Sequence, residues 1–232
     1  MRIFLDIGAH TGETLDVVLD ARWKFDRIFS FEPAPSCWPA LESRRDPRLT
    51  LCRFGLWTQD TSIRLHNPGD VGASVAEDKD DVESSALCDF RDAGEWFEQN
   101  VSSDDEVFAK INIEGAEYEV VERLAASGQL AKIDHLLLHL DVRKSPSRAH
   151  LEPLIRADLE RAGVEYQTAD QIQFGGVLRG TRNWLLWCAA DPRWRDLRYK
   201  RLRSIESRAR VALYPLKVRV AGRRGEGSAT RN

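Results

Sequence analysis

A glycine-containing turn lies close to the start of the chain, between a predicted strand and a predicted helix. It reads Phe4-Leu5-Asp6-Ile7-Gly8-Ala9-His10-Thr11-Gly12. Gly8 lets the chain turn sharply and brings backbone close to a ligand. Gly12 relieves crowding at the helix start, where free N–H groups favour a negatively charged ligand group. The Gly-x-x-x-Gly spacing differs from the Gly-x-Gly-x-x-Gly pattern of dinucleotide-binding folds. The turn is a candidate ligand site, and a purely structural turn is the alternative.

An acidic residue ends the next predicted strand, in Phe29-Ser30-Phe31-Glu32-Pro33. In α/β folds that bind nucleosides, an acid at this place accepts hydrogen bonds from the ribose hydroxyls. A solvent-exposed carboxylate at the strand end is the alternative. We favour the ligand role, because Glu32 follows an apolar, aromatic stretch and is followed directly by Pro33.

Further polar residues follow two later strands. The first group lies in Lys110-Ile111-Asn112-Ile113-Glu114-Gly115-Ala116-Glu117-Tyr118. Asn112 and Glu114 reach the carboxyl end of their strand, where open α/β sheets bind ligands. Glu114 and Glu117 could also have a purely structural role, as acids that stabilise a helix N-terminus. His139 ends the next strand and is a candidate general base, because histidine titrates near neutrality. A hydrogen-bonded histidine at a strand end is the alternative.

The elements that must position these residues alternate between apolar runs and amphipathic stretches, which is typical of a parallel sheet with crossover helices. The predicted strands are Arg2–Ile7, Arg27–Glu32, Leu49–Gly55, Thr61–Leu65, Ala86–Phe90, Val107–Ile113, Ile133–Leu140, Val164–Thr168 and Asn183–Ala190. The predicted helices are Thr11–Ala21, Ser36–Arg45, Asp92–Asn100, Ala116–Ser127 and Arg148–Ala162. Five parallel strands and a final strand pair predict a Rossmann-like α/β fold, with a seven-stranded, mostly parallel, doubly wound sheet and helices on both faces.

These motifs together resemble the FkbM-type methyltransferases. The resemblance lies in Leu5–Gly12, in Phe31-Glu32-Pro33, in Lys110–Tyr118 and in the strand Ile133–His139, and these segments cover most of residues 1–140. It implies a class I methyltransferase fold, S-adenosylmethionine as cofactor, and O-methylation of a hydroxyl on a sugar, glycan or natural product. Family members usually carry aspartate at position 112, and their strand near His139 often reads Gln-Phe-His, so both positions depart from the pattern.

On this basis we assign two groups of site residues. The expected cofactor-binding residues are Asp6, Gly8, Ala9, His10, Gly12, Glu32 and Asn112. The expected catalytic residues are His139 and Glu114. Substrate residues are expected from the irregular segments Asn67–Ser85 and Val142–Arg148, and the glycine-rich connection Gln173–Arg182 is a further candidate for the border of the acceptor pocket. We expect a small-molecule or glycan acceptor.

Three other readings stay open. A metal-assisted reaction would use Glu114, Glu117 and Asp141, but their spacing is loose for a cation site, and we predict no metal. A nicotinamide-dependent oxidoreductase is disfavoured by the glycine spacing and by the lack of a Tyr-x-x-x-Lys pair downstream of the fourth strand. A catalytically silent protein that binds S-adenosylmethionine differs from an enzyme only in turnover.

The charges divide the chain into an acidic body and a basic tail. The net charge is −3, but residues 193–232 hold 13 Lys and Arg against three Asp and Glu. Residues 1–192, the expected catalytic domain, therefore carry a net charge of −13, which argues against nucleic-acid binding by its surface. We expect residues 193–232 to form a basic helix and tail. A solvated helix packed on the acidic body is favoured, and peripheral contact with a membrane or an acidic partner is the alternative.

Cysteine usage and hydropathy bear on the compartment. Cys37, Cys52, Cys88 and Cys188 are scattered, without a CxxC or CxxH pair, so we expect buried reduced thiols. No apolar run approaches the roughly 20 residues that span a bilayer, and the first residues lack the pattern of a signal peptide. A cytoplasmic location is the expectation.

Overall fold

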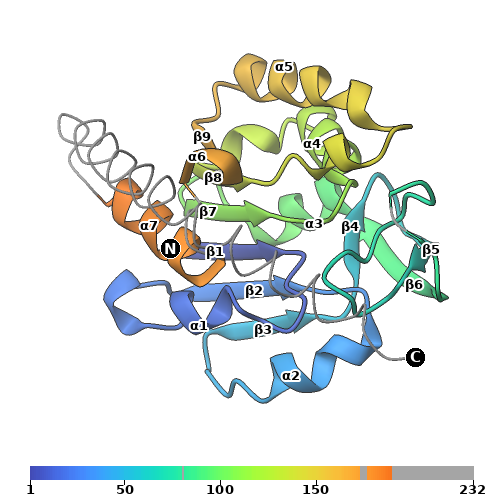
Figure 1. The fold of residues 1–232 in the computed structure, drawn as a ribbon. Coiled ribbons are helices and arrows are strands. Elements are labelled where there is room, and N and C mark those ends of the chain that lie inside the picture. Colours follow the sequence, from blue (N-terminus) through green and yellow to red (C-terminus); the bar gives the residue numbers. More distant parts are fainter. Residues whose placement is uncertain (80, 173–176, 190–232) are drawn as a thin grey trace, which may run out of the picture. The chain divides into compact units, whose positions relative to one another are not determined.

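The computed structural model describes residues 1–79, 81–172 and 177–189 (Figure 1). Met1–Leu185 forms one unit with its own core. The tail predicted over residues 193–232 lies outside the described residues, as do Gln173–Gly176 of the glycine-rich connection.

A six-stranded sheet organises this unit, in the order β3-β2-β1-β7-β8-β9. Its strands are β1 (Arg2–Ile7), β2 (Arg27–Phe31), β3 (Leu49–Cys52), β7 (Glu106–Ile111), β8 (His135–Leu138) and β9 (Tyr166–Thr168). Every neighbouring pair is parallel. The chain builds outward from β1 to β3 and then returns to build outward from β7 to β9. The direction of winding therefore changes between β1 and β7, which is where open α/β sheets bind ligands.

A second, three-stranded sheet is formed by β4 (Gly55–Trp57), β6 (Ser85–Asp92) and β5 (Thr61–His66), in that order. The predicted edge strands Thr61–Leu65 and Ala86–Phe90 are the antiparallel pair β5 and β6. β4 pairs parallel to β6, and two residues separate it from the end of β3. The strand predicted over Leu49–Gly55 covers β3 and reaches only the first residue of β4. The small sheet follows the carboxyl end of β3 (Figure 1).

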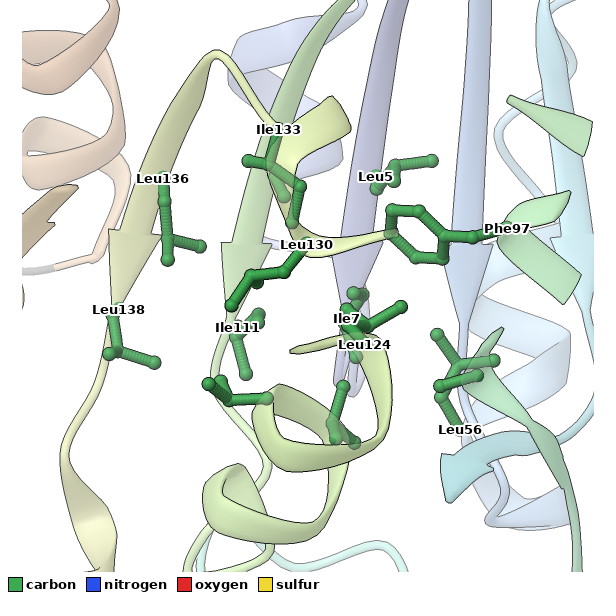
Figure 2. Close-up of a cluster of buried hydrophobic side chains, with 14 of the residues drawn as sticks. Leu5, Ile7, Leu56, Phe97, Ile111, Leu124, Leu130, Ile133, Leu136 and Leu138 are labelled. Atoms are coloured by element: carbon green, nitrogen blue, oxygen red, sulfur yellow. The ribbon is translucent and has the colours of Figure 1, made fainter. Parts of the chain in front are cut away.

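Helices cover both faces of the six-stranded sheet. They are α1 (Leu15–Val18), α2 (Trp38–Glu42), α3 (Ala93–Asn100), α4 (Glu117–Ala126), α5 (Glu152–Ala162), α6 (Ala169–Ile172) and α7 (Val177–Cys188). On one face Leu5, Ile7 and Ile111 pack with Phe97 of α3 and Leu124 of α4 (Figure 2). On the other face, Phe4 and Phe108 meet Trp184 of α7 edge to face. The doubly wound arrangement is thus confirmed.

The predicted seventh strand, Asn183–Ala190, is wrong, because these residues belong to α7 as far as Cys188. Thr181, Trp184 and Leu185 are buried while Arg182 is exposed. Spacings of three and four residues place one face of a helix against the core, whereas a strand buries alternate residues. A short run such as Trp-Leu-Leu-Trp suits either element, so the sequence pattern alone was ambiguous.

Two further predictions from the sequence, a helix start and the state of the cysteines, can be compared with the structure. The helix predicted from Thr11 begins only at Leu15 and spans four residues. Cys37, Cys52 and Cys88 are buried free thiols. Within the described residues, no helix has the length and apolarity needed to cross a membrane.

Candidate functional site

A cavity opens at the carboxyl ends of β1, β2 and β7, at the point where the winding of the sheet changes direction. It encloses about 940 Å³ of space, part of which is open to solvent. Six of the nine residues assigned from the sequence line it: Gly8, Ala9, His10, Glu32, Asn112 and Glu114. Asp6, Gly12 and His139 do not.

The turn after β1 is shaped by Gly8. Gly8 has a φ of +82°, and the amides of Gly8 and Ala9 both donate to the carbonyl oxygen of Phe31 at the end of β2. A Cβ atom on Gly8 would lie 2.0 Å from the carbonyl oxygen of Asn112. The glycine is therefore required because three strand ends meet here, whether or not a ligand is bound.

Glu32 is buried at the end of β2. The alternative hypothesis, that it is a solvent-exposed carboxylate at the strand end, is therefore wrong. Its two carboxylate oxygens accept the amides of His10, at 2.7 Å, and Ala34, at 2.8 Å. Burial raises the pKa of Glu32 above its ordinary value, and these two hydrogen bonds oppose that rise. A carboxylate has about four acceptor positions, so Glu32 fixes the glycine turn and keeps capacity for a ligand.

His10 connects the turn to the opposite wall of the cavity. It has a φ of +50°, which is uncommon for a residue with a side chain. Its Nε2 lies 3.0 Å from the carbonyl oxygen of Gly69, and its Nδ1 lies 3.5 Å from the carboxylate of Glu13. Strained backbone of this kind is concentrated at functional sites.

Asp6 lies beneath the turn rather than in the cavity. Its Oδ1 accepts a hydrogen bond from Lys110 Nζ at 2.8 Å, and the same ammonium donates to the carbonyl oxygen of Gly8 at 3.0 Å. Asp6 and Lys110 are direct partners in the β1–β7 register. Burial raises the pKa of Asp6, and the Lys110 charge opposes that rise. Asp6 therefore holds Lys110 in position, and Lys110 is the one of the two that lines the cavity.

Gly12 supports the turn from outside the cavity. Its φ is +91°, and a Cβ atom there would lie 2.8 Å from the guanidinium carbon of Arg44. Its amide donates to the carbonyl oxygen of Ala9. The amide is thus engaged within the turn, and α1 begins three residues later, so the geometry offers no helix N-terminus to an anion at Gly12.

Asn112 and Glu114 follow β7 and line the cavity. Asn112 Oδ1 is buried and has no hydrogen-bond partner among the described residues. Glu114 has a φ of +52°. Its carboxylate lies 2.7 Å from Lys79 Nζ and 3.1 Å from Lys144 Nζ. Two lysine side chains therefore hold the carboxylate of Glu114 in place.

His139 lies one residue beyond β8 and outside the cavity. Burial, aided by the charge of Lys110, lowers the pKa of His139 from 6.5 to about 3. Its Nε2 is buried without a partner in the described part of the chain. The imidazole is therefore neutral at physiological pH and a weak base.

The three carboxylates considered for a metal are engaged in other ways. Glu117 accepts the amides of Gly115 and Val142, each at 3.0 Å. Asp141 Oδ1 lies 3.1 Å from Lys144, which also binds Glu114. Over residues 1–79, 81–172 and 177–189, no three His, Cys, Asp or Glu side chains are grouped as metal ligands.

The segment Asn67–Lys79, here called the cover loop, forms one wall of the cavity. Its lining residues are Gly69, Asp70, Val71, Ala73 and Val75. The hydroxyl of Ser74 donates to the carbonyl oxygen of Glu114 at 2.6 Å, and Lys79 pairs with the same residue. Part of the segment Asn67–Ser85, from which substrate residues are expected, therefore lines the cavity. None of the residues Val142–Arg148 lines the cavity, whereas Val177 does.

The sequence analysis assigned neither Lys110 nor Glu13, and it did not single out Asp70 within Asn67–Ser85, although all three line the cavity. One signal for Lys110 was present, because it is the single charge within the apolar strand Val107–Ile113. The contributions of Glu13 and Asp70 depend on how the turn and the cover loop fold, and no local pattern indicates them.

Comparisons with known proteins give little beyond this geometry. No family model matches the sequence, and no curated protein matches it. Among solved structures, the chain is similar to the methyltransferase FkbM from Methylobacillus flagellatus KT, with 19% identity and a TM-score of 0.45. The match covers 69% of this chain and 38% of that one, so it spans less than half of the other protein. Similarity this weak assigns neither a ligand nor a reaction.

Proposed function

We propose that the chain is a methyltransferase that uses S-adenosylmethionine and transfers its methyl group to a hydroxyl oxygen. The observation that carries the proposal is the charge of the cavity. Four carboxylates line it, from Glu13, Glu32, Asp70 and Glu114. S-adenosylmethionine has a sulfonium and an ammonium group, and opposite charges attract strongly where water is excluded.

The remaining lining suits the nucleoside part of the same cofactor. Glu32 has free acceptor positions for ribose hydroxyls, as expected for an acid at the end of the second strand. The buried apolar side chains of Leu56, Leu65 and Phe90 also line the cavity and suit a flat adenine ring. The motifs that resemble the FkbM-type family include Gly8, Glu32 and Asn112, which meet in this cavity.

A nicotinamide dinucleotide fits less well. Its pyrophosphate needs free backbone amides, a helix N-terminus or basic side chains. The amides of Gly8, Ala9 and His10 already donate to Phe31 and Glu32. Among the described lining residues, one basic side chain, Lys110, stands against four carboxylates, so a pyrophosphate with its two negative charges would be repelled. The oxidoreductase reading is therefore the second candidate.

Methyl transfer needs an acceptor oxygen in line with the S–CH₃ bond. Positioning of this kind lowers a barrier by roughly 7–11 kcal/mol. Glu114 is the better placed of the two expected catalytic residues, since it lines the cavity and His139 does not. We assign Glu114 to the acceptor side, where the cover loop meets β7. A sugar, glycan or natural-product hydroxyl remains the proposed acceptor, on the basis of the family resemblance.

The proposal is tested by turnover. Purified protein is incubated with S-adenosylmethionine labelled in the methyl group and with pools of hydroxylated sugars and natural products. Labelled product and S-adenosylhomocysteine should form together, and a Glu114→Gln variant should turn over more slowly. Binding of the cofactor without label transfer to any pool would support the silent binding protein instead.

A further inference from the structure

Lys110 is a buried cation in the wall of the cavity. Its side chain is 3% exposed, and the neighbouring residues of β7, Val107–Ala109 and Ile111, are apolar. Among the described residues that line the cavity, Lys110 is the only lysine or arginine. A buried charge is costly unless it is paired and hydrogen-bonded, so the partners of Lys110 decide how its ammonium is held.

The ammonium group is held in place by two contacts. Nζ donates to Asp6 Oδ1 at 2.8 Å and to the carbonyl oxygen of Gly8 at 3.0 Å. A lysine ammonium has three N–H donors. Within the part of the chain that the structure describes, no further acceptor lies within hydrogen-bond distance of Nζ. One N–H donor of the ammonium is therefore left. The ammonium is held next to Gly8, at the point where the turn after β1 lines the cavity.

This inference rests on the proposed function, because it concerns how S-adenosylmethionine lies in the cavity. The cofactor has a single anionic group, the α-carboxylate of its methionine part. Four carboxylates in the lining repel that group, and Lys110 is the cation that attracts it. We propose that Lys110 Nζ binds the α-carboxylate of the cofactor, with Asp6 as the positioning residue that holds the ammonium against Gly8.

The placement orients the whole ligand. The methionine end lies at the Gly8 turn, above Lys110, and the ribose lies at Glu32. The ammonium and sulfonium groups of the ligand then lie among the carboxylates of the lining. Lys110 thereby selects for ligands that carry a carboxylate.

The test uses two ligands that differ only in this carboxylate. S-adenosylhomocysteine and its decarboxylated analogue, which keeps the ammonium group, are titrated by calorimetry into the full chain. A charged hydrogen bond corresponds to a preference for S-adenosylhomocysteine of about 10- to 100-fold in the wild type. Lys110→Met should lose this preference by weakening S-adenosylhomocysteine, with the affinity for the analogue unchanged within about threefold.

Two further variants keep the test decisive. Lys110→Met leaves Asp6 buried without its partner, so the double variant Asp6→Asn/Lys110→Met removes both charges and should also lose the preference. Lys132→Met removes a lysine outside the lining, whose ammonium donates to the carbonyl oxygen of Val101, and should keep the preference. Equal wild-type affinity for the two ligands, or a preference that persists in the double variant, would overturn the role of Lys110. Failure of the wild type to bind either ligand overturns the proposed function itself.

Discussion

Replacement of Glu117 by glutamine should remove a large pH dependence of stability. Glu117 begins α4, is fully buried, and accepts the amides of Gly115 and Val142. Burial, together with the nearby charge of Asp141, raises the pKa of Glu117 from 4.5 to about 7. The two amide hydrogen bonds act in the opposite direction. Glutamine has nearly the same shape but no proton to lose.

The sign and the size follow from this pKa. The folded state holds the proton of Glu117 up to about pH 7, whereas the unfolded chain loses it near pH 4.5. The stabilising contribution is therefore complete below pH 4.5 and is lost as the pH rises through 7. A tenfold change in a proton equilibrium corresponds to about 1.4 kcal/mol, so the loss is on the order of 3 kcal/mol at pH 8.

The assay is urea unfolding of the wild type and Glu117→Gln at about pH 5 and about pH 8. The wild type should lose roughly 3 kcal/mol relative to the variant over this range. His139, whose folded pKa of about 3 lies below its ordinary value, contributes equally to both proteins and cancels. Glu122→Gln on the same helix, at a half-exposed position, should change stability by less than about 0.5 kcal/mol. Parallel pH curves for wild type and Glu117→Gln would refute the reasoning.

Further predictions concern the turn, the cover loop and the histidine. Gly8→Ala should lower the melting temperature far more than Gly128→Ala, because a Cβ at Gly8 collides with backbone and one at Gly128 meets nothing within 4 Å; equal shifts would contradict the packing of the turn. Lys79→Met should speed dissociation of S-adenosylhomocysteine in stopped-flow displacement, since it frees the cover loop from Glu114; an unchanged rate would show that this ion pair does not hold the loop. NMR titration of the His139 ring should show it neutral at pH 5, given its pKa of about 3; a midpoint near 6.5 would disprove its burial.

Much of the fold is predictable because it depends on local patterns. The apolar runs of β1, β2 and β7 and the polar stretch before β6 are visible in the sequence. The strand predicted over Asn183–Ala190 was misassigned because a short apolar run suits a strand or a helix equally. Only packing against Phe4 and Phe108 selects the helix.

The parts of the site that could be predicted are those formed by short sequence motifs. Glu32 accepts the amides of Ala34, two residues further on, and of His10 in the glycine turn, and both Glu32 and His10 lie in motifs identified from the sequence. The Asp6–Lys110 pair depends on which strands are adjacent, so it became visible only with the sheet order. His139 was expected in the site because its strand ends nearby, but residue type and position alone do not show that it is buried outside the cavity.

The most direct test of the proposed function is calorimetric titration of S-adenosylhomocysteine into the wild type and into Glu32→Gln, with the fold of each checked by circular dichroism. Saturable binding should weaken by about 10- to 100-fold in the variant, because a hydrogen bond to a charged group is lost from the ribose. Absence of binding by the wild type, with nicotinamide cofactors bound instead, would contradict the assignment of this cavity to S-adenosylmethionine.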